Sequence, residues 1–505
     1  MIRPRHGRLR PLILAAAVAA GLGPVPLLAQ GYKLKLDARY QSVSFRGIDL
    51  DSIPASAVVQ QAGQGPTSPD GFAVDCGTGT PGYCYYFRPG SRLRGQPLTT
   101  TADLTAWGFG VRGLTIRASG RVATDLASQA VWPGTEPNVV LTEGYAEYAT
   151  TELTGRVGRQ LVTGRLGYQG FDGGRASYRF AGGGLEVGGY GGWGLARAVA
   201  LPVTSPALNP LDDYQPRSRQ LLVGADVAWR HRVFDLRAEY RREVDPDVDY
   251  FVSERAAASA EVHLARKLRV AGGAEYDFVN GWWGTAEASA TYTDRRWYGT
   301  VEARRYRPFF DLWTIWGAFS PVPFRSVRGN AAVEPIRGLW IRGQAERYWF
   351  DPDEAETPLV SAEDRGWRAQ IGATASVTPQ WTLEAGLRSE FGPGASSRTV
   401  DGGITWRPSD AAFFSARAGT LDRPLEFRFS DAKVNWVSMS GDVKLTERLR
   451  LASDIGWFGE ERRRPDAAAF DLNQVRVSTR LVVTLGSAAD RLPRAARPVT
   501  PGGSR

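Results

Sequence analysis

Few residues in this chain are of the types that carry enzymatic or metal chemistry. The chain has three histidines, of which His6 lies close to its start. His231 falls in a short polar turn and His263 near the end of an alternating run, and no GxSxG or HExxH motif accompanies either. The sequence therefore predicts no catalytic residue, no metal site and no cofactor. An enzyme such as a protease or lipid hydrolase is the weaker interpretation.

The two cysteines form the next pair with possible chemistry. Cys76 and Cys84 lie in VDCGTGTPGYCYYF, separated by a stretch that contains glycine and proline. Two soft ligands without a nearby histidine make a poor metal site. In an oxidising compartment such a pair is typical of a small disulfide. We therefore predict a Cys76–Cys84 disulfide that staples a loop.

Arginines and carboxylates form the most regular pattern in the chain. In YKLKLDARY, residues Tyr32–Tyr40, every second residue is apolar and every residue between is charged. An extended strand points successive side chains to opposite faces, so this pattern predicts a strand between two different environments. For an edge strand of a soluble sheet, the two environments are water and a protein core. For a strand of a membrane barrel, they are a lumen and lipid.

The same alternation recurs along the whole chain. We count about 22 such runs, within a range of about 18 to 24, and no helix after the first thirty residues. No later segment approaches the length of uninterrupted apolar sequence that a helical membrane span requires. Examples of the alternating runs are residues 113–125, 233–243, 267–278, 366–377, 381–391 and 474–485.

The connections between runs alternate in length. Short ones lie near Arg112, Glu152, His231, Arg266 and Glu447. Strict alternation of short and long connections is typical of an up-and-down barrel with short periplasmic turns, and it places both termini on the short-turn side. The long connections are predicted at residues 47–97, 125–138, 161–174, 195–217, 308–321 and 351–365.

Aromatic residues on the apolar face cluster at the ends of the runs. Trp229, Trp297 and Trp381 lie near short turns, whereas Tyr276 and Trp367 lie near long loops. Two aromatic bands with smaller apolar residues between them are typical of membrane barrels. We therefore predict an all-β fold, a closed antiparallel up-and-down transmembrane β-barrel of about 22 strands.

The first residues have the composition of a secretory signal peptide. Arg3, Arg5, Arg8 and Arg10 precede the apolar run PLILAAAVAAGLG, and a plausible cleavage site ends at Ala29. We predict a signal peptide at 1–29, a barrel at 30–486 in the cell outer membrane, and a flexible periplasmic tail at 487–505. The formal net charge of +9 owes much to arginines in the leader and tail, so we expect no nucleic-acid partner.

Charged side chains projected inward would line a water-filled lumen. For each of them the alternative is a cross-strand ion pair that stiffens the wall. A mild excess of arginine favours anionic solutes, because the guanidinium group is a planar bidentate donor. The lumen-lining candidates are Arg117, Arg121, Glu143, Glu147, Arg156, Arg175, Arg179, Arg237, Glu302, Arg304, Arg342, Arg368 and Arg388.

A glycine-rich segment, residues 158–180, stands apart from the other runs. Its sequence GRQLVTGRLGYQGFDGGRASYRF has enough glycine for the backbone to turn sharply or fold inward. Together with GYAEYATTELTGRVGRQ at 144–160, it resembles porin-like and alginate-export-like barrels of Gram-negative outer membranes. The resemblance implies a passive outer-membrane channel, and no set of polysaccharide-binding residues can be mapped from it.

A second unusual segment is RPFFDLWTIWGAFSPVPF, residues Arg307–Phe324. It is too aromatic for an ordinary solvated loop. We expect it either to form a constriction in the lumen, to bind a partner or lipid at the rim, or to pack on neighbouring loops.

These observations predict a porin-like channel that passes small polar or anionic solutes down a gradient. Its expected partners are outer-membrane lipid, lipopolysaccharide and those solutes. The alternative is a barrel sheath or export conduit for a periplasmic electron-transfer protein or a secreted polymer, because a lumen of this size can hold a polypeptide. The first strand follows the leader closely, so we do not expect an energised transporter with an N-terminal plug.

Overall fold

The computed structural model describes the chain as strands and short connections. Besides the strands, the described residues contain one 3-10 turn, Ala55–Ala57. No helix among the described residues has the length and apolar character of a membrane span. The predicted leader and tail, and most of the aromatic segment at 307–324, lie outside the described residues, which are 31–60, 65–77, 81–127, 139–195, 220–244, 246, 251–307, 323–350, 364–392, 395–422, 431–463 and 471–486.

The strands follow one another with few interruptions. They are β1 (Gly31–Pro54), β2 (Val74–Asp75), β3 (Tyr83–Gly95), β4 (Pro97–Trp107), β5 (Leu114–Asp125), β6 (Val139–Ala149), β7 (Leu153–Gly164), β8 (Gly167–Arg179), β9 (Leu185–Gly194), β10 (Leu221–Arg230), β11 (Phe234–Val244), β12 (Phe251–Ala265), β13 (Leu268–Asp277), β14 (Trp282–Thr293), β15 (Trp297–Tyr306), β16 (Phe324–Ile336), β17 (Leu339–Phe350), β18 (Arg365–Ser376), β19 (Trp381–Gly392), β20 (Ala395–Ser409), β21 (Ala412–Asp422), β22 (Asp431–Thr446), β23 (Leu449–Arg463) and β24 (Leu472–Gly486).

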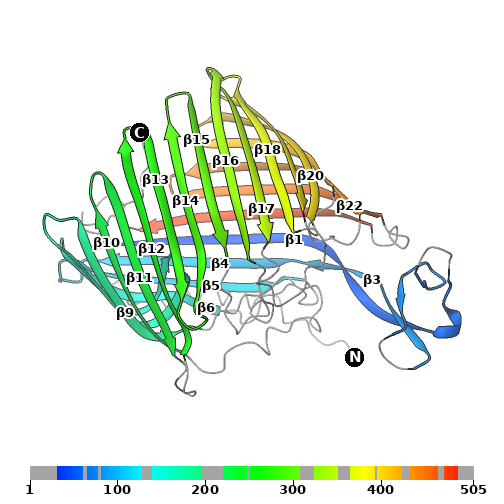
Figure 1. The fold of residues 1–505 in the computed structure, drawn as a ribbon, viewed down its shortest axis with the longest axis horizontal. Coiled ribbons are helices and arrows are strands. Elements are labelled where there is room, and N and C mark those ends of the chain that lie inside the picture. Colours follow the sequence, from blue (N-terminus) through cyan, green and yellow to red (C-terminus); the bar gives the residue numbers. More distant parts are fainter. Residues whose placement is uncertain are drawn as a thin grey trace.

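Strands β1 and β4–β24 form a closed antiparallel barrel of 22 strands. Each strand pairs with the next in sequence, and β1 closes the sheet by pairing with β24 on one side and β4 on the other. Figure 1 shows these strands side by side around the curved wall. Closure leaves no open sheet edge, which is the requirement for a sheet that crosses lipid. The predicted fold class and strand number are confirmed.

The two ends of the barrel sequence lie at the same rim. Lys33 near the start of β1 pairs with Gly486 at the end of β24. Ten connections of two to six residues lie at this rim, which we call the short-turn rim. The short connections predicted near Arg112, Glu152, His231 and Glu447 are among them. The opposite end is called the long-loop rim.

Strict alternation of short and long connections is wrong on the long-loop rim, where four residues, Phe278–Gly281, join β13 to β14 and two further connections are shorter still. Strands β7 and β8 are joined by Arg165 and Leu166 alone, where a long loop at 161–174 was predicted. Strands β19 and β20 are also close together in sequence, since Gly392 pairs with Ala395. The long loop predicted at 161–174 is wrong because glycine interrupts the alternation there, and the interruption resembles a loop.

The first long connection, predicted at 47–97, is largely strand. Beyond the barrel β1 continues and pairs with β3, from Val43↔Gly95 to Pro54↔Tyr83. The two strands project from the wall as a small lobe, seen at the right of Figure 1. Its core contains Phe72, Val74 and Tyr86. Within this lobe Cys76 and Cys84 are joined by a disulfide.

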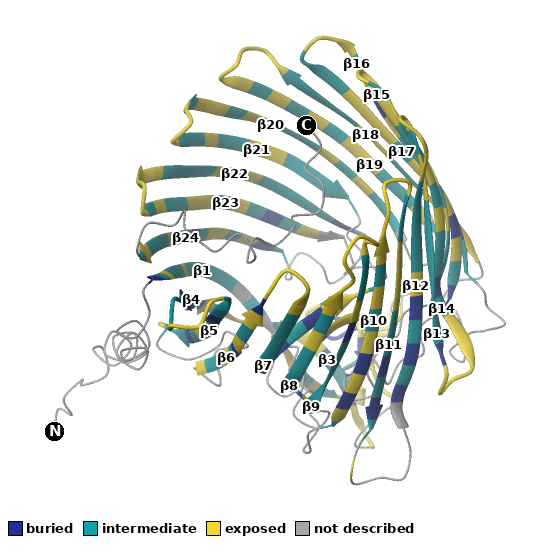
Figure 2. Ribbon diagram, turned by 90° about the vertical axis from the view of Figure 1, so that its left-hand side faces the viewer, coloured by how far each residue is buried: buried dark blue, intermediate teal, exposed yellow. Residues whose placement is uncertain are grey.

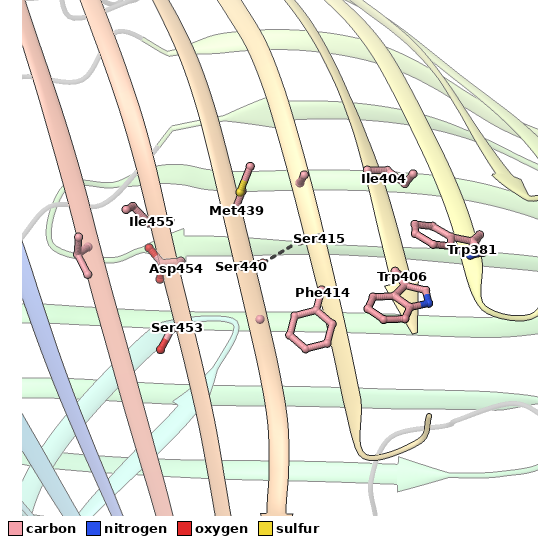
Figure 3. Close-up of a pocket in the computed structure, with 13 residues that line it drawn as sticks. Trp381, Ile404, Trp406, Phe414, Ser415, Met439, Ser440, Ser453, Asp454 and Ile455 are labelled. Carbon is pink, nitrogen blue, oxygen red and sulfur yellow. Dashed lines mark hydrogen bonds between the residues drawn. The ribbon is translucent and has the colours of Figure 1, made fainter. Parts of the chain in front are cut away.

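The outer face of the barrel is apolar and exposed. Large hydrophobic residues such as Val301 (62% exposed) lie on it, which suits lipid rather than water. Aromatic rings stack near the short-turn rim, for example Trp381 on Trp406 with ring centroids 5.7 Å apart. Figure 3 shows these rings beside a shallow groove that also includes Met439 and Ile455. At the long-loop rim Trp367 packs on Phe391. The two predicted aromatic bands are therefore present.

Candidate functional site

Strand register places the thirteen lumen-lining candidates on one common face of the sheet. Residues directly opposite each other on antiparallel strands point to the same side. Glu147, Arg156 and Arg175 follow one another in this way across β6, β7 and β8. The pairs Glu302↔Arg328, Arg328↔Glu346 and Glu346↔Arg368 continue the same face across β15–β18.

Most of these candidates form ion pairs with a neighbouring strand or residue. The pairs are Arg156–Glu147 (2.5 Å), Arg175–Asp226 (3.1 Å), Arg179–Glu186 (2.9 Å), Arg237–Asp235 (3.3 Å), Arg328–Glu302 (2.6 Å), Arg304–Glu287 (3.9 Å) and Arg368–Glu390 (2.8 Å). Arg117 instead donates a hydrogen bond to the Tyr145 hydroxyl at 3.2 Å. Among the described residues Arg121, Glu143, Arg342 and Arg388 form no ion pair. Three cations and one carboxylate of the thirteen candidates are thus without an ion-pair partner among the described residues.

The hairpin of β7 and β8 leaves the barrel wall part-way along its length. Strand β6 pairs with β7 only as far as Arg159, and β9 pairs with β8 only from Phe171. Beyond these positions the two strands of the hairpin pair with each other up to Gly164↔Gly167. The tip of the hairpin therefore has no neighbouring wall strand in register with it.

Paired glycines occupy the point of departure. Gly158 lies opposite Gly173, which lies opposite Gly192 on β9. Gly158 has φ +127°, and a Cβ there would lie 2.3 Å from the carbonyl oxygen of Gly144. A Cβ on Gly173 would lie 2.1 Å from the carbonyl oxygen of Gly191. Only glycine permits this close approach of backbones, so the glycine density of this segment is the local cause of the bend.

The tip of the hairpin contacts strands far away in sequence. The Arg165 guanidinium donates to Glu287 at 3.0 Å and to the Thr285 carbonyl at 3.3 Å. The Leu166 N–H donates to Glu239 at 3.0 Å, and the Leu166 carbonyl accepts from Arg241 at 2.8 Å. These contacts fasten the tip to β11 and β14 with charge-assisted hydrogen bonds.

The contacted face of β11–β14 is the interior of the barrel. On these strands Glu239, Arg241 and Glu287 alternate with apolar side chains such as Ala238 and Ala286, which point the other way. The outward face belongs to the apolar, lipid-type surface described above. The hairpin consequently lies inside the lumen and covers part of its wall.

Below the tip the hairpin packs on apolar side chains of the wall. Phe171 and Leu222 are fully buried and form a cluster with Val162. Tyr190 on β9 packs against this cluster, with its ring centroid 5.4 Å from that of Phe171. Such apolar residues on the inner face of a barrel suit a covering hairpin rather than water.

The most deeply buried charges of the described chain lie on strands β11–β13. Arg241, Glu243, Arg255 and Asp277 are each at most 5% exposed, and they are the only charged residues so deeply buried in the described chain. Arg241 lies 3.3 Å from Glu243, and Arg255 donates to the Leu166 carbonyl at 3.4 Å. Buried charges persist only when they are paired and hydrogen-bonded, and the Leu166 carbonyl of the hairpin supplies an acceptor to both buried arginines.

Sequence reasoning did not single out the residues that hold the hairpin. Arg165, Glu239, Arg241 and Arg255 were absent from the candidate list, although Glu287 belongs to the same pattern as Arg304. The glycine-rich sequence at 158–180 was the available sign that the chain folds inward here. Their partners lie 73 to 122 residues away, at distances that alternation does not encode.

The closed sheet, its apolar outer face with two aromatic bands and its charged inner face define a transmembrane β-barrel of the outer-membrane type. No model of a known protein family matches the chain, and no curated protein matches it in sequence.

Solved outer-membrane barrels resemble the chain weakly. The siderophore receptor PirA from Pseudomonas aeruginosa aligns with 90% of this chain and 80% of its own, at 10% identity and a TM-score of 0.49. OpdL from Pseudomonas aeruginosa aligns with 91% and 99% at 10% identity and a TM-score of 0.39. OccAB2 from Acinetobacter baumannii aligns with 90% and 98% at 9% identity and a TM-score of 0.39.

Proposed function

We propose that the protein is a passive channel of the outer membrane for small polar or anionic solutes. The β7–β8 hairpin narrows the lumen by covering the wall of β9–β14, and solutes pass along the rest of the charged inner face. The observation that carries the proposal is the fastening of the hairpin tip, through Arg165 and Leu166, to the inner face of β11–β14. A strand pair held inside a barrel restricts its cross-section and leaves a self-contained pore.

Anionic solutes are favoured by the cations left over on the inner face. Within the described part of the chain, three candidate cations form no ion pair: Arg121, Arg342 and Arg388. Among the candidate carboxylates in that part, Glu143 alone forms none. An unpaired guanidinium in a narrow lumen offers planar donors to carboxylate or phosphate oxygens. A moderate anion preference follows, since the paired charges of the wall largely cancel.

The proposal includes a topology. Residues 1–29 are a signal peptide, residues 30–486 form the barrel, and the tail 487–505 is periplasmic. The short-turn rim then faces the periplasm, and the lobe with the Cys76–Cys84 disulfide faces outward, where lipopolysaccharide surrounds the barrel. The disulfide suits this oxidising environment.

A barrel that serves as a sheath or export conduit requires an open lumen for its occupant. The inward hairpin occupies part of that space, which favours a channel that conducts solutes by itself. A partner that displaced the hairpin would first break its charge-assisted bonds to β11, β12 and β14. The conduit is therefore the second candidate.

Single-channel recording tests the channel proposal. The refolded mature protein is inserted into a planar bilayer, and reversal potentials are measured in a salt gradient. Steady openings with a weak anion preference are expected. Silence from correctly folded protein, or a very large unselective conductance, would contradict the proposal and direct attention to a partner that fills the lumen.

A further inference from the structure

The charges at the short-turn rim are distributed unevenly around the barrel. Four neighbouring turns, those of the hairpins β10–β11, β12–β13, β14–β15 and β16–β17, form what we call the basic arc. Asp294 is its one carboxylate. The cations of the basic arc are Arg232, Arg266, Lys267, Arg295, Arg296 and Arg337.

The other six turns of the same rim have no such excess. They contain two cations, Arg112 and Arg448, against the carboxylates Glu152, Asp410 and Glu447. The asymmetry is therefore a property of one side of the barrel. It is not a general feature of its short turns.

The arginines of the basic arc are available to an external anion. Asp294, the one carboxylate, accepts a hydrogen bond from the Lys267 ammonium at 2.8 Å. This bond lowers the pKa of Asp294 below its ordinary value, so the carboxylate stays ionised and engaged at neutral pH. The five arginines are exposed and form no ion pair within the described part of the chain.

The position of the arc relative to the aromatic band identifies the kind of anion. Trp229 precedes the first turn by two residues, and Tyr292 stacks on Trp297 across the third turn, with ring centroids 4.7 Å apart. Such rings lie at the level of lipid headgroups. The turns of the arc have only two or three residues, so their charges stay close to that depth.

We propose that the basic arc is a binding surface for anionic phospholipid headgroups in the leaflet at the short-turn rim. Arginines beside a membrane surface attract anionic lipids by about 1 kcal/mol each, which corresponds to about fivefold in affinity. The arc would thus enrich phosphatidylglycerol-type lipids beside β10–β17. The lipid on the opposite side of the barrel would not be enriched in this way. This surface is separate from the lumen and does not depend on what the channel carries.

Lipid binding by the refolded full chain in detergent tests the proposal. Bound lipids are counted by native mass spectrometry after addition of phosphatidylglycerol or phosphatidylethanolamine with identical acyl chains. The wild type is expected to prefer phosphatidylglycerol. The double variant R295Q/R296Q is expected to bind it roughly tenfold or more weakly, with no change towards phosphatidylethanolamine.

The matched control is R112Q/R448Q, which removes the same number of charges from the other side of the same rim. It is expected to retain wild-type lipid binding. Circular dichroism and bilayer conductance report whether each variant folds and conducts, so a failed channel is distinguishable from a failed lipid site. Equal losses in the two double variants would overturn the proposal. Tight binding of polyglutamate without any lipid preference would also overturn it, in favour of an acidic protein partner.

Discussion

The inner wall of the barrel has two contrasting sides. Strands β11–β14 carry buried, paired charges beneath the hairpin, whereas the charges of β20–β24 form exposed ion pairs such as Arg450–Asp442. In Figure 2 the second side is banded in exposed and intermediate colours, while β12 carries several buried segments. Ion pairs follow the same division. The side chains of Arg241 and Glu243 are 4% and 7% exposed, but those of Arg450 and Asp442 are 57% and 17% exposed.

The difference shows how one hairpin changes the role of a lumen charge. On the open side a guanidinium is solvated, and its ion pair contributes little to stability. Beneath the hairpin the same groups are removed from water and must satisfy one another and the tip. The charges of the covered wall are therefore engaged within the protein, whereas those of the open wall stay exposed to water.

Removal of the hairpin tip is expected to have the largest effect. Replacing residues 161–170 by a short glycine–serine turn would uncover the apolar cluster of Phe171 and Leu222 and open the lumen on that side. Single-channel conductance is expected to rise roughly threefold or more, because the narrowest section controls ion flow. The same replacement at 393–394 on β19–β20 is the control and should leave conductance unchanged. An unaltered conductance in the first variant would mean that the hairpin does not restrict the pore.

Breaking one ion pair on the covered wall and one on the open wall compares how much each pair contributes to the free energy of unfolding. Arg241→Ala leaves the Glu243 carboxylate buried and the Leu166 carbonyl without its closest donor, and it should lower the free energy of unfolding by about 3 kcal/mol. Arg450→Ala should cost less than about 1 kcal/mol, because its pair is exposed. Urea unfolding in phospholipid vesicles measures both. Equal losses would show that the hairpin does not desolvate its wall.

The bend of the hairpin can be tested at its glycines. In Gly158→Val the new Cβ meets the Gly144 carbonyl and the backbone is strained at positive φ, with an expected cost of about 1–3 kcal/mol. The hairpin should also be displaced and the conductance altered. Gly155→Val on the same strand is the control, because a Cβ at Gly155 has no atom within 4 Å. A Gly158 variant that matches this control in stability and conductance would rule out the bend as a constraint.

The smallest expected effect is a change in ion selectivity after substitution of a single lumen arginine. Arg388→Gln removes an unpaired cation from the inner face and is expected to shift the reversal potential in a tenfold salt gradient by about 5 mV towards cations. Arg388→Lys retains the charge and should keep the wild-type value. If both variants shift equally, the charge of Arg388 does not contribute to ion preference.

Much of the fold could be predicted from the sequence, because the alternation of apolar and polar residues in each strand indicates which face meets lipid and which meets the lumen. YKLKLDARY places its lysines on the inner face, and the aromatic bands mark both rims. The location of the hairpin could not be predicted in the same way. Alternation continues through residues 153–179 whether the strands remain in the wall or leave it, and the contacts of Arg165 with Glu287 join segments 122 residues apart. Glycine density indicated a bend, but it was also read as a long loop.

The distance between the hairpin tip and strand β14 tests the central claim, that the hairpin lies inside the lumen, most directly. Spin labels are placed at Tyr168→Cys and Ser289→Cys, since both native cysteines are engaged in a disulfide. Electron–electron double resonance in vesicles is then recorded. The structure predicts a short and narrow distance distribution, because Arg165 is bound to Glu287 two residues from the second label. A long and broad distribution would place the hairpin outside the lumen and contradict the account.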